Sequence, residues 1–270
     1  MRNTTNKLIA GACAATILSA CTVRGSQSDQ NVMSKANVEQ NVREFVYPLP
    51  TAFEVTEMLN RIDAAYILDL CNPQENVEKY LTEAKRALNM GIYSADLCYA
   101  STYNQQAQVR EYTQTIRALV SALDMTQAVD PELPSKMENT ENNKDGMTEL
   151  ITNSFYDSYD YLNRNGRGPV SILIVAGSWI EGLNIATHIS DDTFDNKEMV
   201  KIVMSQKEPL EKLMKLMADY PDNEAVKDIR ECLTPLADTY ASVEQNSISE
   251  SQIAGIKAHI GEVRSYIVEP

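Results

Sequence analysis

The chain has 270 residues, with 24 Lys and Arg against 38 Asp and Glu, a formal net charge of −14, and 43% hydrophobic residues. This negative excess repels the phosphates of nucleic acids and of anionic lipid headgroups, so the composition argues against a nucleic-acid partner. The charge favours solubility, but it identifies no binding partner.

The first twenty residues have the pattern of an export signal. Arg2 and Lys7 precede a short apolar stretch, which ends in the small residues of Leu-Ser-Ala-Cys at 18–21. A span across a bilayer requires roughly 20 apolar residues, and this stretch is shorter. We therefore expect residues 1–20 to be a cleaved signal peptide. Its removal takes away two positive charges and no negative one, so the formal charge changes from −14 to −16.

The Leu-Ser-Ala-Cys sequence resembles the lipobox of bacterial lipoproteins. The resemblance implies cleavage before Cys21 and attachment of diacylglyceryl and acyl chains to that residue, which would anchor the protein in a membrane. Thr22 stands where enteric inner-membrane lipoproteins carry Asp, and no acidic run follows Cys21. The resemblance thus implies an outer-membrane lipoprotein that faces the periplasm. An ordinary secretory peptide with a chance cysteine is the alternative.

Beyond the signal, residues 21–46 are predicted to be the lipidated N-terminus and a tether, because residues 22–40 are polar and lack an apolar period. Residues 47–270 form the predicted helical domain. Of the remaining cysteines, Cys71, Cys98 and Cys232, at most two can pair, and Cys98 has the surroundings of a buried structural thiol. The sequence leaves open whether any disulfide forms.

Apolar residues recur at three- and four-residue spacing through the domain, whereas strict alternation is rare. This pattern predicts an all-α, multi-helix bundle. The first expected helix begins at Thr51 and places Phe53, Met58, Ile62, Ala65 and Tyr66 on its inner face. The second begins at Asn72-Pro73 and ends at an interruption at Asn89-Met90-Gly91. Further helices are expected over residues 92–103, 109–123, 147–162, 170–189, 194–219, 222–245 and 249–267. Residues 130–146 are predicted to be a linker, and Pro209 and Pro235 to kink or divide their helices.

Two stretches repeat a pattern at an offset of 86 residues. GIYSADLCYAS at 91–101 and GSWIEGLNIAT at 177–187 share Gly, an aromatic residue, Leu, Ala and a small hydroxyl residue. The shared positions fall on one helical stripe, and none of these residue types performs acid, base or metal chemistry. The repeat favours close helix packing, with a shared ligand groove as the alternative. It suggests two pseudo-repeated halves, at about 51–130 and 147–245.

Two groups of residues are candidates for a ligand site. Trp179, Glu181, Asn184 and His188 lie in the second copy of the repeat, where a carboxylate, an amide and an imidazole share one helical face. Tyr156 and Tyr159 belong to a cluster with Phe155 and Tyr161 that would form an aromatic rim. Hydrogen bonding between helices and ordinary core packing are the structural alternatives for the two groups. No motif for a metal or a cofactor is found.

The domain is similar to the uncharacterised helical lipoproteins of Bacteroidetes, a resemblance that rests on Leu-Ser-Ala-Cys and the helical character and implies no particular activity. The sequence favours a non-catalytic, membrane-anchored protein that binds an envelope protein or a small ligand. A periplasmic hydrolase with carboxylates drawn from several helices is the alternative. A deep pocket with converging carboxylates would favour the enzyme, and an apolar groove would favour binding.

Overall fold

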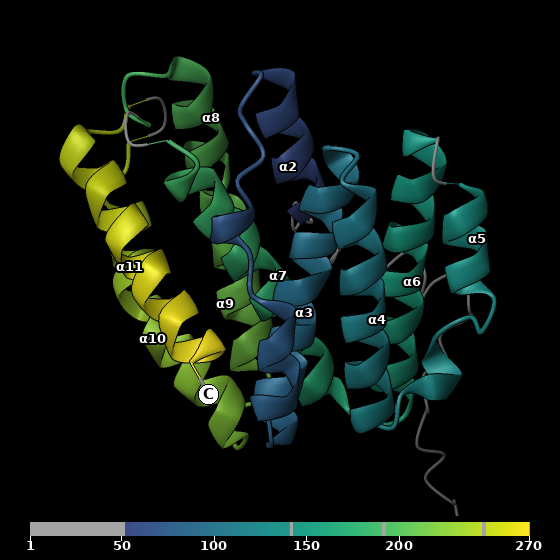
Figure 1. The fold of residues 1–270 in the computed structure, drawn as a ribbon. Coiled ribbons are helices and arrows are strands. Elements are labelled where there is room, and N and C mark those ends of the chain that lie inside the picture. Colours follow the sequence, from purple (N-terminus) through teal and green to yellow (C-terminus); the bar gives the residue numbers. More distant parts are fainter. Residues whose placement is uncertain (1–51, 141–142, 191–192, 245–246, 270) are drawn as a thin grey trace, which may run out of the picture.

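The computed structural model describes residues 52–140, 143–190, 193–244 and 247–269. Within these ranges the chain forms ten α-helices and three short 3-10 helices, which confirms the predicted all-α multi-helix bundle (Figure 1). The elements are α2 (Ala52–Arg61), η1 (Leu68–Leu70), η2 (Gln74–Lys79), α3 (Glu83–Thr102), α4 (Gln106–Ala122), η3 (Thr126–Ala128), α5 (Leu133–Asn139), α6 (Lys144–Arg164), α7 (Gly168–His188), α8 (Lys197–Ser205), α9 (Lys207–Ala218), α10 (Glu224–Ala241) and α11 (Glu250–Val268). The predicted signal peptide, Cys21 and the tether lie outside the described residues.

Local sequence signals set many of the helix ends. Side chains that accept a hydrogen bond from a backbone N–H of the first turn begin five helices: Thr82, Asn143, Asn196, Asn223 and Ser249. Residues with positive φ follow the last turns of α2, α3, α4 and α6, namely Asp63, Asn104, Asp124 and Gly166. These left-handed positions stop the helical hydrogen-bond ladder and turn the chain.

Two predicted helix boundaries near the N-terminus are wrong. α2 ends at Arg61, so Ala65 and Tyr66 lie beyond it, because Asp63 adopts a φ of 55°. The helix expected from Asn72 is instead the short η2, and α3 begins only after Thr82 and continues through Gly91 without the expected interruption. The chain tolerates Gly91 inside the helix because another helix packs directly against it, as described below.

The linker and the two proline positions also differ from expectation in part. Residues 130–146 contain the short helix α5 and the start of α6. The stretch with Pro209 is divided at Gln206 into α8 and α9, as predicted. Pro235, in contrast, lies inside α10, which is not divided.

α3 and α7 form the most extensive helix pair of the bundle. Glu83 pairs with Arg167 at their N-terminal ends, and Gly91 meets Gly177 near the middle. The contacts follow the same order along both helices, so the two run parallel. The two copies of the repeated pattern, 86 residues apart in sequence, therefore lie face to face.

Only glycine fits where α3 and α7 cross. A Cβ built at Gly91 would lie 2.1 Å from the carbonyl oxygen of Ile174, and one at Gly177 would lie 2.0 Å from that of Leu88. The aromatic and Leu positions of the pattern, namely Tyr93, Leu97, Trp179 and Leu183, are at most 6% exposed. The packing interpretation of the repeat is thus confirmed, although Leu97 also reaches the cavity described below. The division into two repeated halves stays a prediction.

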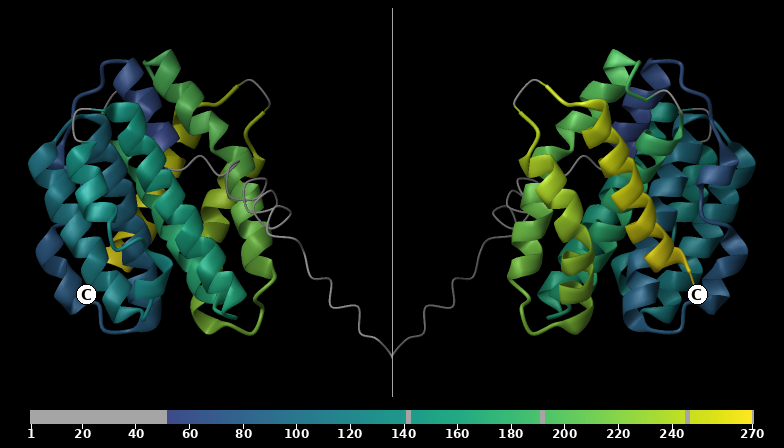
Figure 2. Two further views of the ribbon diagram at one scale, coloured as in Figure 1. Left: turned by 90° about the vertical axis from the view of Figure 1, so that its right-hand side faces the viewer. Right: turned by 90° about the vertical axis from the view of Figure 1, so that its left-hand side faces the viewer.

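The other helices lie on two sides of the α3–α7 pair. Figure 1 shows α4, α5 and α6 on one side and α9, α10 and α11 on the other. Figure 2 shows the bundle as seen from each of these two sides. Among the described helices, α7 alone is long and apolar enough to cross a membrane, and its apolar window is entirely buried inside the fold. That burial is typical of the central helix of a globular bundle.

Candidate functional site

A cavity of about 430 Å³ lies between α3, α4, α6 and α7, with the segment 126–137 along one side. This volume falls within the ~300–1,000 Å³ range of small-molecule sites. Its interior wall is formed by buried or half-buried apolar side chains, including Met90, Leu97, Cys98, Ile116, Val120, Met137, Ile151, Phe155 and Ile174. The cavity can therefore enclose a molecule with a mostly apolar body.

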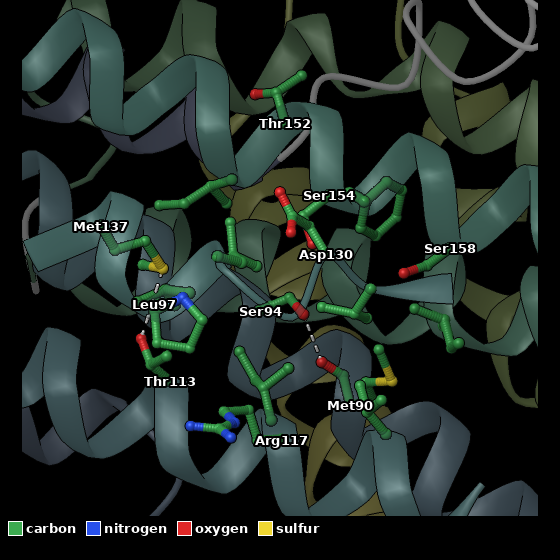
Figure 3. A pocket seen from close by; sticks show the side chains of 18 of the residues that line it. Met90, Ser94, Leu97, Thr113, Arg117, Asp130, Met137, Thr152, Ser154 and Ser158 are labelled. Carbon is green, nitrogen blue, oxygen red and sulfur yellow. Dashed lines mark hydrogen bonds between the residues drawn. The ribbon is translucent and has the colours of Figure 1, made fainter. Parts of the chain in front are cut away.

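The polar groups of the wall are mainly hydroxyls. Figure 3 shows Ser94 and Thr113 among the apolar side chains, with Ser154 and Ser158 across the cavity. Ser94 Oγ donates to the carbonyl oxygen of Met90 at 2.7 Å, and Thr113 Oγ1 donates to that of Val109 at 2.6 Å. Because these protons are committed to the helix backbone, the two hydroxyls keep only acceptor capacity toward the cavity.

The two charged residues of the lining, Arg117 and Asp130, are both exposed and lie at the mouth. The Asp130 carboxylate accepts hydrogen bonds from the backbone N–H of Glu132 and from Lys136, and these bonds, that of Lys136 first, lower its pKa. Arg117 has no ion pair or hydrogen bond within the described part of the chain. Among the described residues of the lining, Arg117 is therefore the cation that keeps its donors available.

The residues predicted from the second repeat do not line this cavity. Glu181 is fully buried, and both of its oxygens accept from Arg264 of α11, at 2.6 Å from Nε and 2.9 Å from Nη2. Asn184 is buried, and its carbonyl oxygen contacts His188 Nδ1 at 2.9 Å. Burial lowers the pKa of His188, so the imidazole favours its neutral form. This face packs against α11, where Glu181 pairs with Arg264 and His188 lies beside Gly261.

Asp96, which the sequence did not single out, completes a buried ionic cluster with Glu181 and Arg264. Its Oδ2 accepts from the backbone N–H of Asn72 at 3.1 Å, whereas its Oδ1 is buried and has no donor among the described residues. Burial, and next the charge of Glu181, raise the pKa of Asp96 well above its ordinary value. A protonated Asp96 can donate from Oδ1 to the neighbouring Glu181 carboxylate, which satisfies that oxygen.

Further buried polar side chains connect this cluster to the surrounding loops. Asn72 Nδ2 donates to Tyr80 Oη at 3.0 Å and to Asn89 Oδ1 at 3.2 Å. Tyr80 and Asn89 in turn donate to the last carbonyls of α11, at Val268 and Ile267. The network ties α3, α11 and the 72–80 segment together, and buried networks of this kind hold helices in one register.

The aromatic residues predicted to bind a ligand do not all line the cavity. Trp179 is 3% exposed and lies outside the cavity wall, although its neighbour Ser178 belongs to it. From the cluster on α6, Phe155 lines the cavity, whereas Tyr156 and Tyr159 do not. Tyr159 is half-buried, and burial, followed by the nearby Tyr220, raises its pKa. The predicted aromatic rim is therefore represented in the cavity by Phe155.

The three described cysteines are free thiols. Burial is the main cause that raises the pKa of each, for Cys98 in the cavity wall to about 12 and for Cys71 further still. In the residues that the structure describes, no three His, Cys, Asp or Glu side chains gather as they would to hold a metal ion.

The sequence contains a weak signal for Asp96, which was not predicted as a site residue. Asp96 is an isolated acid within the apolar run of the first repeat, a position that favours a partnered, buried carboxyl. The cavity had no comparable signal, because its lining residues come from five separate segments and look like ordinary core positions. Searches of protein-family models, curated proteins and solved structures find no match to this chain.

Proposed function

We propose that the helical body binds a small, mostly apolar molecule in the cavity between α3, α4, α6 and α7, and that it does so without catalysis. The observation that carries the proposal is the 430 Å³ space with an apolar interior and its charged groups confined to the mouth. Transfer of an apolar ligand from water into such a space is favourable by ~25 cal/mol per Å² of buried apolar area.

The segment over the cavity supports a binding role. Val129, Leu133, Pro134 and Met137 from the stretch between α4 and α6 contribute to the wall. The described side-chain links between this stretch and α4 include a weak contact at 3.9 Å from Thr113 Oγ1 to Met137 Sδ. A segment held mainly by apolar contacts can move aside at modest cost and admit a ligand.

The membrane anchor is part of the same proposal. We infer from the lipobox resemblance that lipid on Cys21 holds the domain at the outer membrane, facing the periplasm. Cys21→Ala is expected to release the protein from the membrane fraction into the soluble fraction of the source cell. Retention of the variant in the membrane would contradict the anchor.

The alternative, a hydrolase, would use the converging carboxyls of Asp96 and Glu181. These carboxyls are fully buried, Glu181 is neutralised by Arg264, and neither lines the cavity. A substrate would therefore have to open the α3–α7–α11 contact in order to reach them. The geometry favours binding over hydrolysis.

Calorimetric titration with 1-decanol, a neutral amphiphile, tests the cavity. Ser154→Phe places a ring in the space, and Asn153→Phe, at the neighbouring exposed position outside the wall, is the matched control. We expect Ser154→Phe to weaken 1-decanol binding about tenfold or more and Asn153→Phe to leave it unchanged, because only the first occupies ligand volume. No binding to the unmodified protein, or equal loss in both variants, would refute the proposed function.

A further inference from the structure

Within the described ranges of the chain, Arg117 at the mouth of the cavity is a cation without a partner. Asp130 and Lys136 form an ion pair with each other, which leaves Arg117 of α4 as the uncommitted charge of the lining. The guanidinium of Arg117 presents a planar fork of donors, which matches the geometry of carboxylates and phosphates.

The distribution of exposure along the wall gives the orientation of a ligand. Arg117 is exposed, whereas Met90, Cys98 and Ile174 in the interior are buried. An ionised headgroup at the mouth keeps much of its hydration, while a charge taken into the apolar interior would be strongly disfavoured. The chain carries a net charge of −14, so attraction of an anion here depends on the local cation and not on the overall field.

The shape of the interior favours a flexible chain over a rigid ring system. Met90 and Met137 contribute unbranched thioether side chains that adapt to different ligand positions. The hydroxyls of Ser94 and Thr113 already donate to backbone carbonyls, so they impose few directional demands on the ligand. Together these features suit an acyl or alkyl chain.

We propose that the ligand is a single-chain amphiphile with an anionic head, its carboxylate or phosphate paired with Arg117 at the mouth and its alkyl chain in the cavity. This inference rests on the proposed function, since it specifies which molecule the same cavity takes.

The test compares ten-carbon probes that differ only in the head: decanoate, decyl phosphate, 1-decanol and decyltrimethylammonium. Each is titrated into the unmodified protein, into Arg117→Gln and into Arg110→Gln. Arg110 lies two turns earlier on α4, is also exposed and does not line the cavity, so its substitution removes the same charge without touching the mouth.

We expect Arg117→Gln to weaken the better-bound anionic probe about three- to tenfold, as for a charge-assisted bond that is partly exposed. Binding of 1-decanol should not change, and binding of decyltrimethylammonium should improve. Arg110→Gln should leave all four affinities as they are. A preference for decanoate assigns the head as a carboxylate, and a preference for decyl phosphate assigns it as a phosphate monoester.

Two other outcomes separate failure of this inference from failure of the proposed function. If 1-decanol binds and Ser154→Phe abolishes its binding, but Arg117→Gln affects all probes equally, the cavity site stands and the anionic head is refuted. If none of the four probes binds the unmodified protein, the cavity itself is refuted as a ligand site. Within the saturated carboxylates, affinity should rise about fourfold per methylene until the cavity is full.

Discussion

Asp96→Asn should change how the stability of the fold depends on pH. The raised pKa of Asp96 means that the folded state holds a proton that the unfolded chain releases above its ordinary pKa, near 3.9. Asn replaces the protonated carboxyl closely: its amide can donate toward Glu181 while its oxygen accepts from the backbone N–H of Asn72.

The sign and size follow from proton linkage. A raised folded-state pKa contributes stability that is complete below the unfolded pKa and is lost as pH rises through the folded pKa. Each pH unit in this interval costs ~1.4 kcal/mol of unfolding free energy. As long as Asp96 keeps its proton in the folded state, the unmodified protein should therefore lose stability relative to Asp96→Asn as the pH rises above the unfolded pKa.

Urea unfolding at several pH values measures this difference directly. Asp130→Asn is the control, because the pKa of Asp130 is lowered and its contribution changes only below this pH range. If the unfolding free energies of Asp96→Asn and the unmodified protein change in parallel with pH, the proposed protonation of Asp96 in the folded state is refuted. His188, whose lowered pKa destabilises the fold as pH falls, contributes equally to both curves and cancels in the difference.

Substitution at the helix crossing and thiol labelling give two further predictions. Gly91→Ala should destabilise the fold by ~3 kcal/mol or more in thermal unfolding, because its Cβ would meet the carbonyl oxygen of Ile174 at 2.1 Å. Gly255→Ala is the control, because a Cβ at Gly255 would have its nearest neighbouring atom at 3.7 Å, and this substitution should be neutral or stabilising by up to ~1 kcal/mol. Equal destabilisation by Gly91→Ala and Gly255→Ala would contradict the close crossing of α3 and α7. In the native protein, a disulfide reagent should label Cys232 before the two buried thiols, and equal rates for all three would contradict their burial.

Much of the helical content was predictable because its signals are local. The capping residues Asn143, Asn196, Asn223 and Ser249 stand beside their helices in sequence, and apolar periodicity identified most of the segments. Predictions of helix boundaries failed where a contact with a distant helix outweighed the local preference of a residue. From its local sequence, Gly91 is predicted to interrupt a helix, yet it lies within α3 because α7 packs directly against it.

The candidate site was less predictable than the fold. Glu181, Asn184 and His188 share a helical face, which the sequence revealed, but the same pattern suits a ligand site and a helix contact equally well. At Glu181 the pattern serves a helix contact, because Arg264, 83 residues away, pairs with both oxygens of its carboxylate. No spacing rule connects residues so distant in sequence.

By itself, the sequence determined the all-α class, most of the helices and the inward orientation of the repeated pattern, since these depend on neighbours within one or two turns. The tertiary structure alone decided that the repeats cross each other at Gly91 and Gly177, that Asp96 meets Glu181, and that a cavity opens beside Arg117. The physical reason is that such features depend on the packing of helices far apart in the chain, whereas periodicity reports only which face of each helix is apolar.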